Sequence, residues 1–166
     1  MQTYSLSQVN RMTQIEFIAA LGSIFEASPW VAEQAELKRP FETIEILYQT
    51  MVDIVKNSNS QQQLALIRAH PDLGSKAKMA ESSIKEQAGV GLDRLTVAEY
   101  KQFHQLNQTY KDKFSFPFII AVKNHTKISI LSAFEQRLNN SIEQEKITAL
   151  EEIYKIAQFR LYEKFD

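Results

Sequence analysis

The chain has 166 residues, of which 44% are hydrophobic and 23% charged; this is an ordinary globular composition, and the length suits one domain with a sizeable core. Its 19 basic and 20 acidic side chains give a formal net charge of -1, which argues against binding to nucleic acid or to an anionic membrane surface. Because the chain contains no cysteine, it can form no disulfide, thiolate nucleophile or cysteine-ligated zinc site.

Neither end of the chain carries a recognisable targeting signal. The N-terminal segment MQTYSLSQVNRM lacks the apolar core of a signal peptide, and the C-terminal EKFD is not a peroxisomal address. No apolar run approaches the length of a membrane span. We therefore expect a cytoplasmic protein with no membrane association.

Capping signals and apolar spacings predict helices along most of the chain. The first predicted helix starts at the capping box Thr13–Glu16 and carries apolar residues to Phe25, and the second has Ser28 as N-cap and Pro29 as first residue. A third helix follows Pro40, and a fourth covers 60–70. The fifth starts at the capping box Thr96–Glu99, and the sixth runs from Ser141–Gln144 to about Lys164. One face of the fifth helix carries Val97, Tyr100, Phe103, Asn107 and Tyr110.

Residues 114–122, FSFPFIIAV, form an apolar run without helical character. Its β-branched residues and central proline fit either a short strand or an extended buried segment. Four glycines and four prolines leave little turn material, and no internal repeat is visible. The predicted fold is all-α: a single irregular multi-helix domain over residues 1–166, with a short extended apolar segment near 114–122.

Three polar positions are not explained by packing alone, and the first is His70. Pro71 disfavours the α conformation of the residue before it, so the imidazole should lie where a helix ends. It could interact with the helix C-terminal carbonyls, which favour positive charge, or it could take part in chemistry. Asp72 could hydrogen-bond the backbone of the turn.

The second position is the stretch SSIKEQAGVGL, residues 82–92. A helix would place Ser83, Glu86 and Gln87 on one face, and Gly89 and Gly91 would end it. The spacing alone favours the simpler interpretation, an exposed capping box followed by a glycine stop. The GVG sequence lacks the preceding strand and the further glycine of a dinucleotide-binding fingerprint, so we reject a phosphate-binding loop.

The third position is Arg160, which shares a helical face with Ile153, Ile156 and Ala157. Its guanidinium either extends outward to solvent or reaches a buried anion. We expect the other two histidines, His104 and His125, to be structural or surface residues. No metal-ligand spacing such as H-E-x-x-H occurs, so no metal site is expected.

Several longer stretches occur together in the order and spacing of one enzyme family: AHPDLGSKAK, SIKEQAGVGLDRL, LNQTYKDKFSFPFIIAV and ALEEIYKIAQFRL. EFIAALGSIFEASPWVAEQA and RPF are similar to the family as well, so the resemblance covers nearly the whole chain. The chain resembles the 2-oxo-4-hydroxy-4-carboxy-5-ureidoimidazoline (OHCU) decarboxylases of purine degradation.

This resemblance implies an all-α domain that forms a homodimer, needs no cofactor, and converts OHCU into S-allantoin and CO2. Its substrate would come from a hydrolase to which the enzyme is functionally coupled. The resemblance places the catalytic residues at His70, Glu86 and Arg160. It places the substrate-binding residues at Pro71, Ser83, Ile84, Lys85, Glu86, Gln87, Phe118, Ile119, Ile120, Ala121 and Val122.

Two residues depart from the family pattern. Ser75 stands where a second glycine usually follows HPDLG, and Ser115 stands where F-G-F-P-F is common. These departures concern loop conformation more than chemistry. Two other interpretations are a non-catalytic helical interaction domain, and the same fold acting on another ureido-imidazole.

Overall fold

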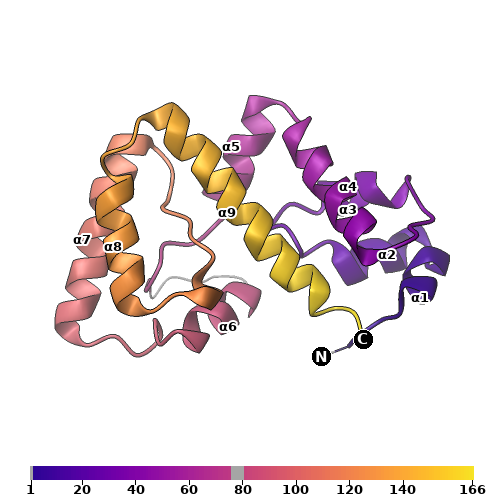
Figure 1. Cartoon of the computed structure of the whole chain (residues 1–166), viewed down its shortest axis with the longest axis horizontal. Coiled ribbons are helices and arrows are strands. Elements are labelled where there is room, and N and C mark those ends of the chain that lie inside the picture. Colours follow the sequence, from indigo (N-terminus) through magenta and orange to yellow (C-terminus); the bar gives the residue numbers. More distant parts are fainter. Residues whose placement is uncertain (1, 76–80) are drawn as a thin grey trace. The chain divides into compact units, whose positions relative to one another are not determined.

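The structure, a computed structural model, describes residues 2–75 and 81–166. In these ranges the chain forms nine α-helices and one 3-10 turn, with no strand beyond an isolated bridge between Tyr4 and Phe165 (Figure 1). The predicted all-α class is confirmed. The last three residues of the AHPDLGSKAK motif lie outside the described ranges.

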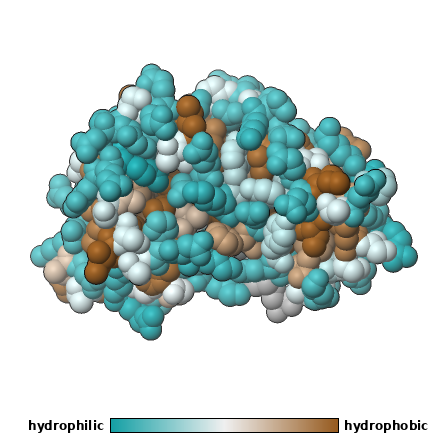
Figure 2. All heavy atoms as spheres, in the orientation of Figure 1, coloured by the Kyte–Doolittle hydropathy of each residue, from teal (hydrophilic) through white to brown (hydrophobic). Residues whose placement is uncertain are grey.

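The chain divides into two compact units, one formed by Met1–Ala69 with Tyr154–Asp166 and the other by His70–Ile153. The last helix, α9 (Ile142–Tyr162), contributes residues to both. The single domain over 1–166 stays a prediction. No helix in the described part of the chain is both long and apolar enough to cross a membrane. Hydrophilic side chains cover most of the face shown in Figure 2.

The first unit is built from short helices at the N-terminal end and the final turns of α9. The helices are α1 (Leu6–Arg11), α2 (Gln14–Leu21), α3 (Trp30–Glu36), α4 (Ile44–Lys56) and α5 (Ser60–Arg68). Helix α3 packs against both α2 and α4. The predicted capping box is present, because the Thr13 side chain accepts from the Glu16 N–H while Glu16 accepts from the Thr13 N–H. Helix α1 was not predicted.

Two expectations for this unit were wrong in detail. Helix α2 ends at Leu21, so Ile24 and Phe25 are buried in the loop that follows it rather than on the helix. The N-cap of α3 is Pro29 and not Ser28. The Ser28 hydroxyl donates instead to the backbone carbonyl of Glu26, at 2.8 Å, and so stabilises the loop rather than the helix start.

The second unit holds α6 (Glu81–Gly89), α7 (Val97–Phe114), η1 (Val122–Asn124), α8 (Lys127–Arg137) and the beginning of α9. The capping box of Thr96 and Glu99 opens α7 as predicted. Phe103 and Tyr110 are buried on this helix, but Val97 is 75% exposed, because it occupies the first helical position, before the buried face begins. Helix α8, which was not predicted, lies beside α7.

The segment between α7 and η1 is extended and buried. Of the two alternatives for 114–122, a short strand and an extended buried segment, the structure has the second. It contains no strand, and its side chains from Phe116 to Ala121 are buried. The ring of Phe118 stacks on Phe134 of α8 with a centroid distance of 3.7 Å. The segment therefore contributes to the core of this unit through its aromatic residues.

Candidate active site

His70 lies where the sequence predicted it, immediately after a helix. Helix α5 ends at Arg68, Ala69 is its C-cap, and the chain then bends at His70. The histidine is buried, with 8% of its surface exposed. Because Pro71 has a fixed φ angle, the backbone direction on the far side of the imidazole is constrained.

The turn that follows His70 is attached to α6 through Gln87. The Gly74 N–H donates to Gln87 Oε1 at 2.9 Å, and both residues are buried. Gly74 has a φ angle of +68°, and an added Cβ would come within 2.7 Å of Leu95 Cδ1. The positive φ angle is the reason that glycine is favoured at this position, and an added Cβ would also require the end of the Leu95 side chain to move. Ser75 continues the turn, with its N–H donating to the Asp72 carbonyl at 3.4 Å.

Helix α7 holds the same turn at two further points. The side-chain amide of Asn107 donates to the Leu73 carbonyl at 2.8 Å, and Lys111 forms an ion pair with Asp72 at 2.6 Å. The Asp72 carboxylate thus bonds a lysine on another helix as well as lying in the turn. Asn107 Oδ1 is buried without a hydrogen-bond partner. Three side chains from two helices therefore hold the residues next to His70.

The polar residues of α6 are distributed as its spacing predicted. Ser83 and Gln87 are buried and Glu86 is half-buried, whereas the side chains of Ile84 and Lys85 are exposed. Helix α6 also lies against η1, which starts at Val122. Three of the predicted site stretches therefore lie together in this unit: the turn after His70, α6, and the end of the apolar segment.

The apolar segment is held by an arginine that no motif of the sequence predicts. Arg137 of α8 donates through Nη1 to the Ile119 carbonyl at 2.6 Å, and its guanidinium lies 4.3 Å from the centre of the Phe118 ring. The second terminal nitrogen, Nη2, is buried without a hydrogen-bond partner. Arg137 fixes one backbone carbonyl in the middle of the predicted substrate-binding segment.

A fully buried carboxylate pairs with this arginine. Glu145 Oε1 accepts from Arg137 Nε at 2.8 Å and from the Tyr110 hydroxyl at 2.5 Å, and Oε2 accepts from Asn140 at 3.0 Å. Burial, and then the hydrogen bond to the Glu145 carboxylate, raise the pKa of the Tyr110 phenol well above its ordinary value. Tyr110 therefore acts as a neutral hydrogen-bond donor at all ordinary pH values.

Arg160, in the first unit, reaches a buried anion rather than solvent. Its side chain is 6% exposed, and Nη1 lies 2.8 Å from the Glu26 carboxylate. The same nitrogen lies 3.5 Å from the Ile24 carbonyl, at the limit of a hydrogen bond. The outward-extending alternative is wrong, because the guanidinium finds its counterion inside the unit. Of the other histidines, His104 is exposed, and His125 Nδ1 lies 3.0 Å from the Ser129 hydroxyl.

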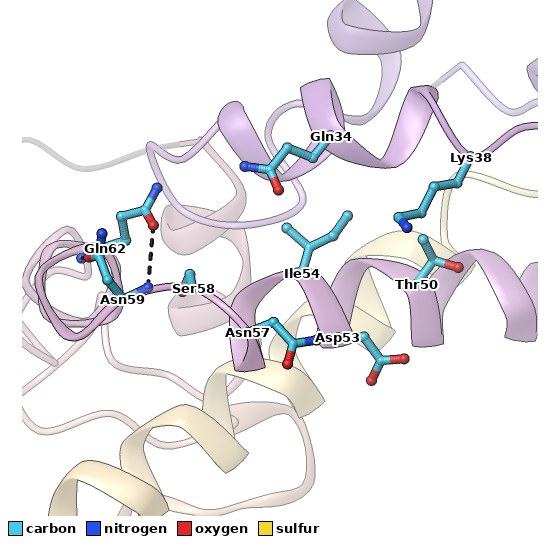
Figure 3. A pocket seen from close by; sticks show the side chains of 9 residues that line it. All are labelled: Gln34, Lys38, Thr50, Asp53, Ile54, Asn57, Ser58, Asn59 and Gln62. Carbon is cyan, nitrogen blue, oxygen red and sulfur yellow. Dashed lines mark hydrogen bonds between the residues drawn. The ribbon is translucent and has the colours of Figure 1, made fainter.

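A surface groove of the first unit contains none of the predicted site residues. Its volume is about 580 Å³, and polar side chains dominate its lining (Figure 3). Helix caps and connections occupy much of this surface; for example, the Asn59 N–H donates to Gln62 Oε1 at 3.4 Å. The described residues also include no group of three or more acidic or histidine side chains arranged to hold a metal ion.

The fold and this constellation define a class: an all-α protein in which a buried histidine at a helix end is followed by a turn that amide and ion-pair contacts hold. Residues 10–162 match the family model described as OHCU decarboxylase. The chain belongs to this family.

Individual relatives agree with the family match. The chain is 43% identical to the 2-oxo-4-hydroxy-4-carboxy-5-ureidoimidazoline decarboxylase of Haloferax volcanii, over 99% of this chain and 98% of that protein. It is 47% identical to a uric acid degradation bifunctional protein of a Bacillus species, over 96% of this chain but 32% of that protein. A crystal structure of (S)-allantoin synthase superposes with a TM-score of 0.81 at 36% identity, covering 98% of this chain and 55% of that one.

Proposed function

We propose that this chain decarboxylates OHCU to S-allantoin during urate degradation, without a cofactor. Besides family membership, one observation carries the proposal: Gln87 of α6 bonds the turn next to His70, and α6 lies against η1. Stretches that are far apart in the sequence thereby present an imidazole, a carboxylate, a carboxamide and backbone groups in one unit.

The substrate supplies its own electron sink, which explains how side chains alone can catalyse the reaction. When CO2 leaves, the electron pair of the broken bond forms a double bond to the neighbouring imine carbon, and the imine nitrogen takes up a proton. The product of this step is an enol. Protonation of the ureido-bearing carbon on one face, with loss of the hydroxyl proton, then gives a single enantiomer of allantoin. The protein has to orient the ring, stabilise shifting charge and move protons.

His70 is the proton-handling group in this proposal. An imidazole with an ordinary pKa near 6.5 can accept or give a proton at neutral pH. It hydrogen-bonds the substrate hydroxyl and removes its proton as the enol becomes the ketone. General acid–base help of this kind contributes about 10²- to 10⁴-fold in rate. The constrained turn at Pro71 keeps the ring in one approach direction.

The polar face of α6 and the apolar segment bind the rest of the substrate. Glu86 accepts hydrogen bonds from the ureido arm and ring N–H groups, and Ser83 lies one turn earlier on the same face. Gln87 Oε1 accepts from Gly74, and the carboxamide of Gln87 binds an amide-like edge of the substrate. Ile84 and Lys85, whose side chains are exposed, contribute through their backbone. Pro71 and the backbone of Phe118–Val122 line the ring.

Arg160 orients the substrate rather than gripping its carboxylate. A guanidinium that bound the departing carboxylate tightly would stabilise the ground state more than the transition state, because CO2 is neutral. Its ion pair with Glu26 supports this role, since the positive charge of Arg160 is already compensated.

The proposal is tested by supplying freshly generated OHCU and following the optical activity of the allantoin formed. The expected result is S-allantoin at a rate far above the spontaneous one. Racemic product at the spontaneous rate refutes the proposed activity and favours the interpretation as a helical interaction domain. Optically inactive product together with turnover of another ureido-imidazole would instead assign a different substrate to the same fold.

The proposal extends to assembly and cellular context. The family resemblance supports a homodimer in the cytoplasm, to be checked by light scattering and by fractionation. The bifunctional Bacillus relative, of which this chain matches about a third, supports functional coupling to another enzyme of uric acid degradation. We propose that this enzyme is the hydrolase that supplies OHCU. OHCU is unstable. Adding that hydrolase should therefore raise the yield of S-allantoin more than adding an equal amount of an unrelated protein does.

A further inference from the structure

We propose that Arg137 is a positioning residue for the reaction, which holds the Ile119 carbonyl and thereby directs the backbone N–H groups that follow it toward the substrate ring. This inference deepens the proposed function and rests on it, because it assigns the side chain that orients the predicted substrate-binding segment. All the residues that carry this role lie within the second unit, His70–Ile153.

The guanidinium of Arg137 is held from several directions. Its Nε donates to Glu145 at 2.8 Å, its Nη1 donates to the Ile119 carbonyl at 2.6 Å, and its central carbon lies 4.3 Å from the centre of the Phe118 ring. Nη2 is buried and has no hydrogen-bond partner in the described part of the chain, so the pair with Glu145 is monodentate. An arginine and a carboxylate can form two parallel bonds. Arg137 therefore does more than neutralise Glu145, since it also holds a backbone carbonyl.

The contact with the Ile119 carbonyl also sets the direction of the next N–H group. The Ile119 carbonyl and the Ile120 N–H belong to one planar peptide group, and in a trans peptide they point in opposite directions. Among the described residues the one cis peptide bond is the bond before Pro40, so the bond between Ile119 and Ile120 is trans. Because Arg137 holds the oxygen, the Ile120 N–H points away from Arg137, to the opposite side of the segment.

The N–H groups of Ile120 and Ala121 have no acceptor within the protein. Both residues are buried, with 4% and 5% of their surface exposed. Within residues 2–75 and 81–166, neither N–H donates a hydrogen bond. Nearly all buried N–H groups in folded proteins are paired, because an unpaired donor is costly. An acceptor on a ligand satisfies both, and a ring carbonyl that gains negative charge during the reaction is an acceptor of this kind.

The orientation of the ring decides which enantiomer of allantoin forms. Helix α6, which carries the other predicted substrate-binding groups, packs against η1, and η1 begins directly after Ala121. A ring bound by α6 and by the two N–H groups presents one face to the proton donor. When the Ile119 carbonyl is released, the peptide group is free to turn, the N–H groups lose their direction, and protonation reaches both faces of the enol.

The experiment compares Arg137→Lys with wild type in the OHCU assay. It measures kcat and the optical purity of the allantoin, after subtraction of the reaction without enzyme. Lysine keeps the positive charge beside Glu145, but its ammonium does not reproduce the planar fork that reaches both Glu145 and Ile119. We expect kcat to fall about 10- to 100-fold, less than for deletion of an oxyanion donor, because the N–H groups are misdirected rather than removed. We also expect the product to contain R-allantoin.

Tyr110→Phe is the matched control. It removes a hydrogen bond to Glu145 from the same buried cluster but leaves both contacts of Arg137 in place. This variant should unfold at a lower urea concentration than wild type, yet its product should be as optically pure as that of wild type. If Arg137→Lys does not fold, the double variant Arg137→Gln/Glu145→Gln, which leaves no unpaired charge in the cluster, replaces it with the same expectations.

A merely structural role would lower kcat through loss of folded protein and leave the product optically pure. Unchanged optical purity in the Arg137 variant therefore overturns the inference, whatever its kcat. An equal loss of optical purity in Tyr110→Phe also overturns it, because instability of the cluster would then be sufficient. Racemic product from the wild-type protein refutes the proposed function itself, whereas pure product from both wild type and the Arg137 variant refutes only the role of Arg137.

Discussion

Replacement of Gln87 by leucine tests whether α6 holds the turn next to His70. Leucine keeps nearly the same volume but cannot accept the hydrogen bond that Gly74 now donates at 2.9 Å. The Gly74 N–H lies in a buried turn, so it would lose its partner without gaining water. An unsatisfied buried donor costs about 1–3 kcal/mol, and the apolar leucine recovers part of this by burying more hydrocarbon. The expected net loss is about 1–2 kcal/mol of unfolding free energy.

The assay is urea unfolding followed by far-UV circular dichroism. With an m-value of about 2 kcal/mol/M for a chain of this size, the midpoint should fall by about 0.5–1 M. Gln102→Leu on the exposed side of α7 is the control, and it should change stability by less than about 0.5 kcal/mol. In the absence of urea the Gln87→Leu variant should fold but show a lower kcat, because the same turn carries His70. A midpoint no lower than that of the control would show that the Gly74 contact does not hold the turn.

Three further variants test other parts of the structure. His70→Ala should lower kcat at least about 100-fold with an unchanged circular dichroism spectrum, and a loss under about threefold would remove the imidazole from the mechanism. Tyr110→Phe should cost about 2 kcal/mol near neutral pH, because it deletes a hydrogen bond to the buried Glu145 carboxylate. Since the folded-state pKa of Tyr110 is raised, its stabilisation is fully present below the unfolded tyrosine pKa of about 10 and is lost above it. The stability gap between wild type and Tyr110→Phe should therefore narrow as the pH rises past about 10, and a constant gap would contradict the assigned shift. Ser115→Gly should raise the free energy of unfolding by about 0.5–1 kcal/mol, because Ser115 ends α7 with a φ angle of 64°. The same urea titration measures this gain. If there is no gain, the left-handed conformation of Ser115 is not strained.

Local signals in the sequence were sufficient for much of the helical structure. Capping boxes at Thr13 and Thr96 mark helix starts in the structure, and the helix before Pro71 ends where the proline requires it. These signals act within one helical turn, so they are readable without knowledge of the fold. The α2 helix shows their limit: its start was predicted, but its end at Leu21 was not, because apolar spacing continues into a buried loop.

A left-handed backbone conformation could be predicted from the sequence only where that position shows a preference for glycine. The family usually has glycine where this chain has Ser115, and the structure explains that preference, since the position is left-handed at the end of α7. Ala27 gives no such signal. Alanine is ordinary in a loop, so nothing in the sequence indicates its φ angle of +44°.

The ion-pair partners of the buried arginines could not be predicted from any sequence pattern. Arg160 on an apolar helical face was consistent with solvent exposure or with a buried anion, and only the fold identifies Glu26 as that anion. Likewise, the apolar run that ends at Val122 gave no indication that Arg137, paired with Glu145, would hold its backbone. Both arginines are buried with a carboxylate at 2.8 Å. In both cases the fold supplies the counterion, and no local sequence signal predicts it.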